Sequence, residues 1–417
     1  MEDIFIKSIH INKIRHLENI DIPISETERK HLILTGKNGS GKTSVLLEIK
    51  NWLNGIENQQ LLQLQNNRIN IENLEGGITR LQNELSVGGD RFEVERQIIL
   101  YNNSINLYRN QTEHFLNIDI DFSSANMFQF YNDGDFILAH FSARRNLQIN
   151  VPKGINKVLL KDKYGINENA GIDFVQFIVN LKADRSFARD ENDDISVNQI
   201  NNWFNNFEKS LQNILGDDKL RLEFDRKEYN FTLINKDGES SDFTTLSDGY
   251  STIINIISEL IMRMESKASK SYDIQGIVLI DEIETHLHID LQKKILPFLT
   301  SFFPKIQFIV TTHSPFVLNS IENAMIFDLE KKLLVEDMTG YSVNAIVESY
   351  FDSDDYSTVV KEKMVRYENL SERDDLNEEE EDELFELKEY FEDLPKMFSP
   401  ELALKINQIQ LANLSLK

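Results

Sequence analysis

The chain has 417 residues, 41% of them hydrophobic and 27% charged, which is the composition of an ordinary globular protein with a core large enough for roughly two to three domains. Its formal net charge of −25 argues against a body that coats nucleic acid non-specifically, because neutralising phosphates takes clustered lysines and arginines. The absence of cysteine excludes disulfides, cysteine-bound zinc and a cysteine nucleophile, and the lack of a membrane-spanning apolar run or a signal-peptide pattern leads us to expect a cytoplasmic protein with no membrane partner.

Three apolar segments at the start of the chain predict strands. Isoleucines alternate with polar residues in 4–11, and the pattern returns in 20–24. The run 32–34 is apolar throughout, as a buried strand would be, and a glycine-rich loop follows it directly.

That loop, residues 36–43, carries the complete pattern G-x-x-x-x-G-K-[ST] between a strand and a helix. Glycines let the backbone N–H groups curl around phosphate oxygens, Lys42 can reach the β- and γ-phosphates, and the Thr43 hydroxyl can ligate Mg²⁺. The alternative is a plain turn before a helix, which the complete pattern disfavours. The residues predicted to bind ATP here are Gly36, Asn38, Gly39, Ser40, Gly41, Lys42, Thr43 and Ser44.

A Gln/Asn/Leu-rich insertion, residues 52–90, comes next. Its seven-residue repeat predicts a short coiled-coil hairpin, but an ordinary amphipathic helix pair stays open because Gly76 and Gly77 interrupt the repeat. The seam positions are Leu64, Asn67, Ile71, Leu74, Ile78, Leu81 and Leu85.

Segments rich in β-branched and aromatic residues follow the insertion. They predict strands of an antiparallel arm at 92–100, 105–108 and 115–122, and a buried strand at 136–141.

Arg144 and Arg145 come directly after the predicted strand 136–141. They could contact nucleotide, a second subunit or DNA, or form surface ion pairs, and Gln148 is a weaker candidate for a contact to metal or water.

Two strand ends in the second half carry polar side chains. The apolar run 277–280 ends in Asp281 and Glu282, as a central strand delivering acid to a nucleotide site would. Asp281 would hold Mg²⁺ and Glu282 would polarise the attacking water. The run 306–312 ends at His313, whose neutral imidazole could bond the γ-phosphate. A lone histidine at a strand end is more often structural, but its position after Asp281-Glu282 and before Ser314-Pro315 favours the functional role.

The stretch 245–250 is a Ser/Gly turn that opens a helix, and helix N-termini bind anions. The phosphate loop, this turn, Asp281-Glu282 and His313 follow one another along the chain in the order of the motifs of ATP-binding-cassette ATPases. The sequence resembles that family, within its SMC, Rad50, RecF and OLD-like branch. In that resemblance Leu246 to Tyr250 correspond to the cassette signature, with Asp248 at its third position. Ser247 and Gly249 would then contact the γ-phosphate held by an opposite subunit.

Residues 284–288, Glu-Thr-His-Leu-His, are similar to the E-x-H-L-H motif of OLD-like and related bacterial defence ATPases. His286 and His288 could alternatively ligate a metal, but a dimer-contact loop explains them better. The C-terminal region resembles that of the AAA-family ATPases of bacterial anti-phage systems of the Septu, PARIS and retron-associated kind. We expect no fused nuclease, so that a cutting activity would belong to a separate effector partner.

The resemblance implies an α/β P-loop NTPase of ABC/SMC-head type, with a mostly parallel central sheet, an antiparallel N-terminal arm and a helical lobe. It also implies a homodimer, or a larger homo-oligomer, closed around ATP and Mg²⁺, with catalysis by Glu282, His313 and Lys42. An SMC- or RecF-like protein that binds DNA without a nuclease is the alternative. The expected parts are an N-terminal ATPase lobe (1–51 and 91–170), the insertion (52–90), a helical lobe with a hairpin (171–240), a signature and carboxylate lobe (241–340) and a helical C-terminal region (341–417).

Overall fold

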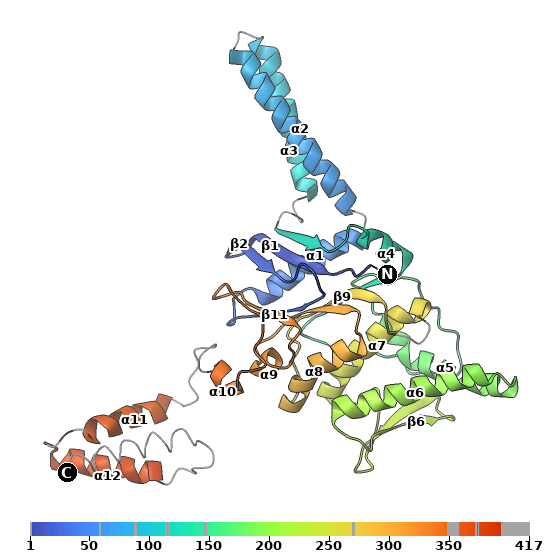
Figure 1. The fold of residues 1–417 in the computed structure, drawn as a ribbon, viewed down its shortest axis with the longest axis vertical. Helices are drawn as coiled ribbons and strands as arrows, with labels where there is room; N and C mark the ends of the chain where they lie inside the picture. The colour runs from blue at the N-terminus through green and yellow to red at the C-terminus, as the bar shows by residue number, and fades with distance from the viewer. Residues whose placement is uncertain are drawn as a thin grey trace. The chain divides into compact units, whose positions relative to one another are not determined.

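The structure is a computed structural model, and Figure 1 labels many of its helices and strands. It divides into two compact units, Met1–Val343 and Asn344–Lys417. The residues that the structure describes are 2–57, 60–86, 90–112, 115, 117–145, 148–268, 272–347, 358–371, 373 and 375–392.

A six-stranded sheet runs through the first unit, in the order β12-β11-β3-β10-β9-β5. Neighbouring strands are parallel except β11 and β12. The inner strands are buried along their whole length and mostly apolar, which is what a parallel sheet covered on both sides requires. The strands are β3 His31–Thr35, β5 Phe136–Phe141, β9 Gln275–Ile280, β10 Ile306–Thr311, β11 Ala324–Asp328 and β12 Leu333–Val335.

A smaller antiparallel sheet, β2-β1-β4, contains the N-terminal strands. Two buried glutamines attach it to the central sheet. The Ile4 N–H donates to Gln275 Oε1 and the Ile6 N–H donates to Gln307 Oε1, both at 2.7 Å. Its strands are β1 Ile6–Ile14, β2 Leu17–Pro23 and β4 Ile118–Phe122.

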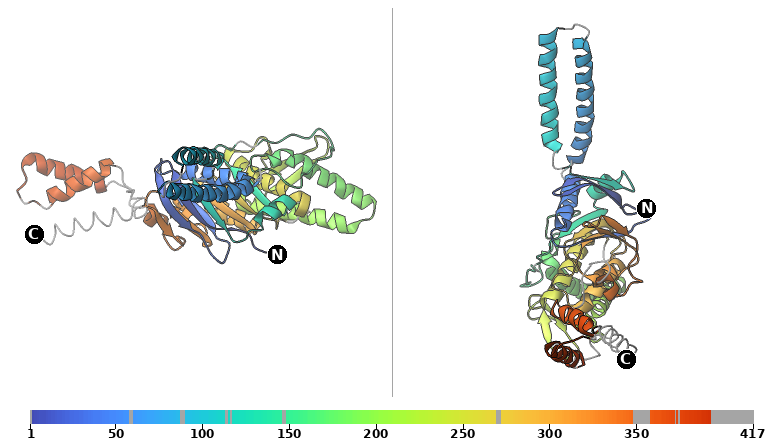
Figure 2. Two further views of the ribbon diagram at one scale, coloured as in Figure 1. Left: turned by 90° about the horizontal axis from the view of Figure 1, so that it is seen from above. Right: turned by 90° about the vertical axis from the view of Figure 1, so that its left-hand side faces the viewer.

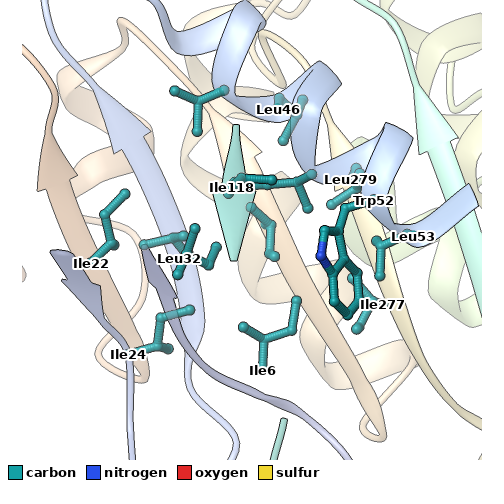
Figure 3. Packing of buried hydrophobic residues seen from close by; sticks show 14 of the residues in the cluster. Ile6, Ile22, Ile24, Leu32, Leu46, Trp52, Leu53, Ile118, Ile277 and Leu279 are labelled. Atoms are coloured by element: carbon teal, nitrogen blue, oxygen red, sulfur yellow. The ribbon is translucent and has the colours of Figure 1, made fainter. Parts of the chain in front are cut away.

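The core between the two sheets is filled by isoleucines and leucines of the strands and by helix α1, Lys42–Glu57 (Figure 3). Leu46 and Leu53 of α1 are fully buried, and Trp52 stacks on Phe122 with ring centroids 5.6 Å apart. This packing fixes α1 against the sheet, and with it the loop from which α1 starts. The expected mostly parallel sheet and antiparallel N-terminal sheet are therefore confirmed.

Helices α2, Gln60–Ser86, and α3, Arg91–Thr112, form an antiparallel hairpin inserted in the sequence between α1 and β4, and the right view of Figure 2 shows the two helices side by side. The strands predicted at 92–100 and 105–108 are wrong, since that whole stretch is α3. The hairpin therefore extends past residue 90, and of the predicted arm only β4 is a strand. Seam residues from Ile71 to Leu85 are partly buried, an ion pair of 2.8 Å joins Arg109 to Glu75, and Leu64 lies outside the described side chains.

The first unit also contains a helical lobe with the small sheet β6-β7-β8, and the antiparallel pair β6-β7 is the hairpin expected within 171–240. Phe174, Phe177, Trp203 and Phe207 form its aromatic core. The other elements of the first unit are α4 Met127–Asp133, η2 Ala170–Asp173, α5 Phe174–Asp190, α6 Asp194–Leu215, β6 Arg221–Asp225, β7 Asn230–Ile234, β8 Ser240–Asp242, α7 Asp248–Ala268, α8 Ile289–Phe302 and α9 Pro315–Leu318. The short helix α10, Val343–Ala345, begins at the last residue of the first unit.

The second unit contains α11, Thr358–Ser371, and α12, Glu378–Glu392, packed on a small core of Met364, Tyr367 and Phe391. The first turn of α12 consists of glutamates, which the positive end of the helix dipole favours. Residues 393–417 of the expected C-terminal region lie outside the described residues. No helix in the described part of the chain is long and apolar enough to cross a bilayer.

Candidate active site

The phosphate loop joins the end of β3 to the first residue of α1. Gly36, Gly39 and Gly41 have φ angles of 131°, 86° and 101°, in the region where a side chain is strained. At Gly36 there is also no room, because a Cβ would lie 2.8 Å from Ser40 Oγ. The sequence pattern thus has a conformational cause, and the loop curls tightly enough to surround a phosphate.

Lys42 lies inside this loop and is 6% exposed. Its ammonium group donates to the carbonyl oxygens of Gly36 at 2.8 Å and Lys37 at 3.1 Å. Burial lowers the pKa of Lys42, against the opposing charges of Glu282, Glu284, Asp281 and Asp328. The carbonyl groups of the loop hold the ammonium group in place, and an oxygen of a bound phosphate could replace them as hydrogen-bond acceptor.

Polar atoms of the loop are suited to a nucleotide and a magnesium ion. The buried Ser40 Oγ has no hydrogen-bond partner among the described residues, and a phosphate oxygen would supply one. Thr43 Oγ1 donates to Asp281 Oδ1 at 3.1 Å, so a hydroxyl and a carboxylate meet beside the loop. These are the hard oxygen ligands that Mg²⁺ prefers, with phosphate and water completing its shell.

Asp281 follows β9 and is held by the neighbouring strand. Thr311, the last residue of β10, donates from Oγ1 to Asp281 Oδ1 at 2.7 Å. The Asp281 N–H donates to the Phe141 carbonyl at 2.9 Å. The carboxylate is 5% exposed, so the register of β9 and β10 fixes it towards Thr43.

Glu282 is the residue of the site with an unusual backbone, since its φ of 45° is in the left-handed region. Its N–H donates to Thr311 Oγ1 at 2.7 Å, and its carbonyl accepts from Arg145 Nη2. Its Oε2 accepts from Thr285 Oγ1 at 3.2 Å. The carboxylate is near enough to Lys42 and His313 to affect the pKa of both.

His313 lies on the loop after β10. Its backbone N–H donates to Glu284 Oε1 at 2.6 Å, while Glu284 Oε2 is buried with no partner among the described residues. Burial and the charge of Lys42 lower the pKa of the His313 imidazole, against Glu284 and Glu282. The ring is therefore neutral at pH 7 and can both donate and accept a hydrogen bond.

The signature turn packs beside the loop that follows Glu282. A Cβ on Gly249 would lie 3.0 Å from the His286 carbonyl oxygen, and the Ser251 N–H donates to the Ser247 carbonyl at 2.8 Å. Ser247 and Asp248 are exposed. In the described chain, no hydrogen bond or ion pair ties this turn to Lys42 or Thr43.

The structure thus brings Lys42, Thr43, Asp281, Glu282 and His313 together, and leaves Ser247 and Gly249 on a separate turn. Gln148 is exposed, and in the part of the chain described no group of three or more His, Asp or Glu side chains is arranged to hold a metal ion. Thr311 was missed by sequence reasoning. Its only signal was a hydroxyl at the end of the strand that leads to His313.

The family described as "AAA domain, putative AbiEii toxin, Type IV TA system" matches residues 32–319, from the phosphate-loop strand past His313. The chain belongs to this family. An AAA domain binds ATP, so membership in the family places the phosphate loop of this chain among ATP sites and the chain among ATPases.

Among the relatives of this AAA-domain chain is the Septu protein PtuA of Bacillus mycoides (strain KBAB4), 27% identical over 405 residues, 92% of this chain and 50% of that one. The Retron Vc95 probable ATPase of Vibrio cholerae serotype O1 biovar El Tor is 24% identical, over 78% of this chain and 74% of that one. These relatives confirm the resemblance to Septu and retron-associated ATPases. The chain spans about half the length of that PtuA.

A solved structure similar to the chain is the Smc head domain with an extended coiled coil bound to the C-terminal domain of ScpA, from Pyrococcus furiosus. It is 9% identical, covers 79% of this chain and 95% of that one, and has a TM-score of 0.33.

Proposed function

We propose that the protein is a Mg²⁺-dependent ATPase that dimerises around ATP. The observation that supports the proposal is the meeting of Thr43 and Asp281 beside a phosphate loop, with Glu282 and a neutral His313 next to it. Gly36 to Ser44 would surround the phosphates, Thr43 and Asp281 would hold the metal, and Lys42 would neutralise charge on the β- and γ-phosphates. Bound Mg²⁺ would supply charge neutralisation at the phosphate oxygens.

Hydrolysis follows from the placement of Glu282. Its carboxylate accepts the proton of a water whose oxygen forms a bond to the γ-phosphorus, while the bond to the bridging oxygen of ADP breaks. The imidazole of His313, neutral at pH 7, donates a hydrogen bond to the γ-phosphate. The products are ADP, phosphate and a proton, which leaves Glu282 ionised for another turnover.

A dimer is proposed because, among the described residues, no hydrogen bond or ion pair joins Ser247 or Gly249 to Lys42 or Thr43 of the same chain. Two copies would complete two sites, each loop facing the signature turn of the other, with ATP closing the dimer and hydrolysis opening it. The test is light scattering of Glu282→Gln protein in saturating ATP and Mg²⁺, with Lys42→Ala as the control that does not bind ATP. We expect dimers or larger oligomers for the first variant only. A Glu282→Gln protein that stays monomeric contradicts the proposal.

We further propose that this ATPase acts in the cytoplasm as the sensor subunit of an anti-phage defence complex that controls a separate nuclease. The support is the similarity to Septu and retron-associated proteins. Co-expression with the product of the neighbouring gene, followed by pull-down, tests it. A co-purifying HNH or toprim-like protein whose cutting depends on Glu282 is expected, and DNA cutting by the ATPase alone would contradict it.

A second candidate, a DNA-binding maintenance ATPase, is favoured by one groove. It has a volume of about 760 Å³ and lies along α6 and α8. Among the described residues its lining includes Lys209, Lys293 and Lys294 and no carboxylate, although the net charge of the whole chain is −25. Such a local reversal of charge suits phosphate oxygens. Steeply salt-dependent DNA binding that is lost in the triple lysine-to-glutamate variant would favour this candidate over control of a nuclease.

A further inference from the structure

Arg145 is the buried group at the site that the chemistry above does not use. It comes just after β5 and is 8% exposed, so it does not form the surface ion pair that the sequence left open. Its Nη2 donates to the main-chain carbonyls of Asp281, at 3.3 Å, and of Glu282. Burial lowers the pKa of its guanidinium to about 10, which leaves it charged at neutral pH.

The peptide of Glu282 is held from both sides. Thr311 accepts its N–H at 2.7 Å, and Arg145 donates to its carbonyl. Between these two hydrogen bonds φ is 45°, a value that a residue with a side chain keeps only when its surroundings enforce it. If either hydrogen bond is lost, the peptide can relax to negative φ, and the direction of the Cα–Cβ bond changes with it.

We propose that Arg145 is a positioning residue for ATP hydrolysis, which keeps the Glu282 carboxylate directed at the attacking water by holding the Glu282 carbonyl. The inference rests on the proposed role of Glu282 as the base. Arg145 acts through the main chain of Glu282 and does not contact the reacting atoms. Its loss therefore slows turnover and leaves ATP binding in place.

Space around Arg145 allows a direct test. The residue lines a cavity of about 350 Å³ next to the signature turn, together with Phe243, Thr244 and His286. Nε and Nη1 of Arg145 have no hydrogen-bond partner among the described residues, so the guanidinium is fixed from one side only. A free guanidinium ion can reach this position through the cavity once the side chain is shortened.

The experiment compares steady-state ATP hydrolysis and ATP binding by Arg145→Ala and the wild type. We expect kcat to fall about 100-fold while KM and the Kd for Mg-ATP change by less than about threefold. Millimolar guanidinium chloride should restore at least about a tenth of the lost rate, whereas sodium chloride at equal concentration should not. The control is Arg221→Ala, because Arg221 is an exposed arginine of β6 outside the site, and its kinetics should equal those of the wild type.

Arg145→Lys covers the case in which the alanine variant does not fold. A lysine keeps the charge, but its ammonium group stands on a flexible stem and lacks the rigid plane that places Nη2 of Arg145 against the two carbonyls, so kcat should still fall at least about tenfold. The inference is overturned if Arg145→Lys turns over like the wild type, or if Arg145→Ala loses ATP binding and gains nothing from guanidinium. If Glu282→Gln and the Arg145 variants all hydrolyse ATP at the wild-type rate, the proposed function itself fails. If Glu282→Gln is slow and the Arg145 variants are not, this inference alone fails.

Discussion

Thr311 Oγ1 lies 2.7 Å from Asp281 Oδ1, which ties the end of β10 to the carboxylate after β9. The same oxygen accepts the N–H of Glu282 at 2.7 Å. One hydroxyl therefore holds the carboxylate of Asp281, the proposed metal ligand, and the main chain of Glu282, the proposed base.

Thr311→Val tests this relationship, because valine keeps the shape and removes the hydroxyl. We expect ATP hydrolysis to fall about 10- to 100-fold and the Mg²⁺ concentration for half-maximal rate to rise, as when other groups that orient a metal ligand are lost. A magnesium titration of the initial rate measures both effects. The neighbouring Thr312→Val is the comparison, since Thr312 does not bond either carboxylate among the described contacts. Equal rates for the two variants would contradict the assignment.

Arg263 and Glu259 of α7 form a buried ion pair, with side chains 2% and 9% exposed. Arg263 also donates to the carbonyls of Leu138 and Glu168, at 2.7 and 2.6 Å. Arg263→Met leaves Glu259 buried without its countercharge, and we expect the free energy of unfolding to fall by about 3–5 kcal/mol. Urea unfolding followed by tryptophan fluorescence measures it.

That fluorescence reports on the first unit alone, because both tryptophans, Trp52 and Trp203, lie in it. The control is therefore Arg366→Met, which removes an exposed ion pair to Glu383 in the second unit. It should leave the tryptophan transition within about 0.5 kcal/mol of the wild type. An Arg263→Met transition that also stays there would show that the buried pair does not stabilise the fold.

His31 on β3 makes stability depend on pH. Its Nδ1 accepts the Phe308 N–H at 3.1 Å, and burial, with a smaller effect of Arg29, lowers its pKa from 6.5 to about 4. Between these values the unfolded chain binds the proton and the folded chain does not, so stability is full above pH 6.5 and falls as the pH drops towards 4. The loss amounts to about 3 kcal/mol.

His31→Asn separates this effect from that of His140, whose pKa burial also lowers to about 4 and which acts in the same direction. Asparagine can accept the Phe308 N–H but does not titrate. Unfolding by urea at a series of pH values from 7 to 4 should show a pH dependence smaller by about 3 kcal/mol in the variant. The same slope in both proteins would show that His31 is not held neutral.

The parts of the site that the sequence predicts are those encoded in one contiguous stretch. The glycines at 36, 39 and 41 are required by positive φ angles, and the apolar runs of β9 and β10 end at the carboxylates and at His313. Thr311 and Arg145 could not be assigned in this way. Their contacts to Glu282 depend on the order β10-β9-β5, which brings together strands far apart in the chain.

Helix α3 was mistaken for strands for a related reason. A helix that packs against a single partner needs only one narrow apolar seam, and Phe92, Ile99 and Leu107 of α3 remain exposed. These residues obscure the helical period, while aromatic and β-branched side chains suggest a strand. Packing against α2 stabilises this stretch as a helix, and the local sequence of α3 does not indicate that partner.

Phosphate release by wild-type and Glu282→Gln protein in saturating ATP and Mg²⁺ tests the central claim most directly. The claim is that Glu282, held at φ 45° between Thr311 and Arg145, is the base for ATP hydrolysis. We predict a rate at least about 100-fold lower for the variant, with the Kd for ATP unchanged or lower, because glutamine keeps the size of the side chain and cannot take the proton. A Glu282→Gln protein that releases phosphate at the wild-type rate would contradict the account.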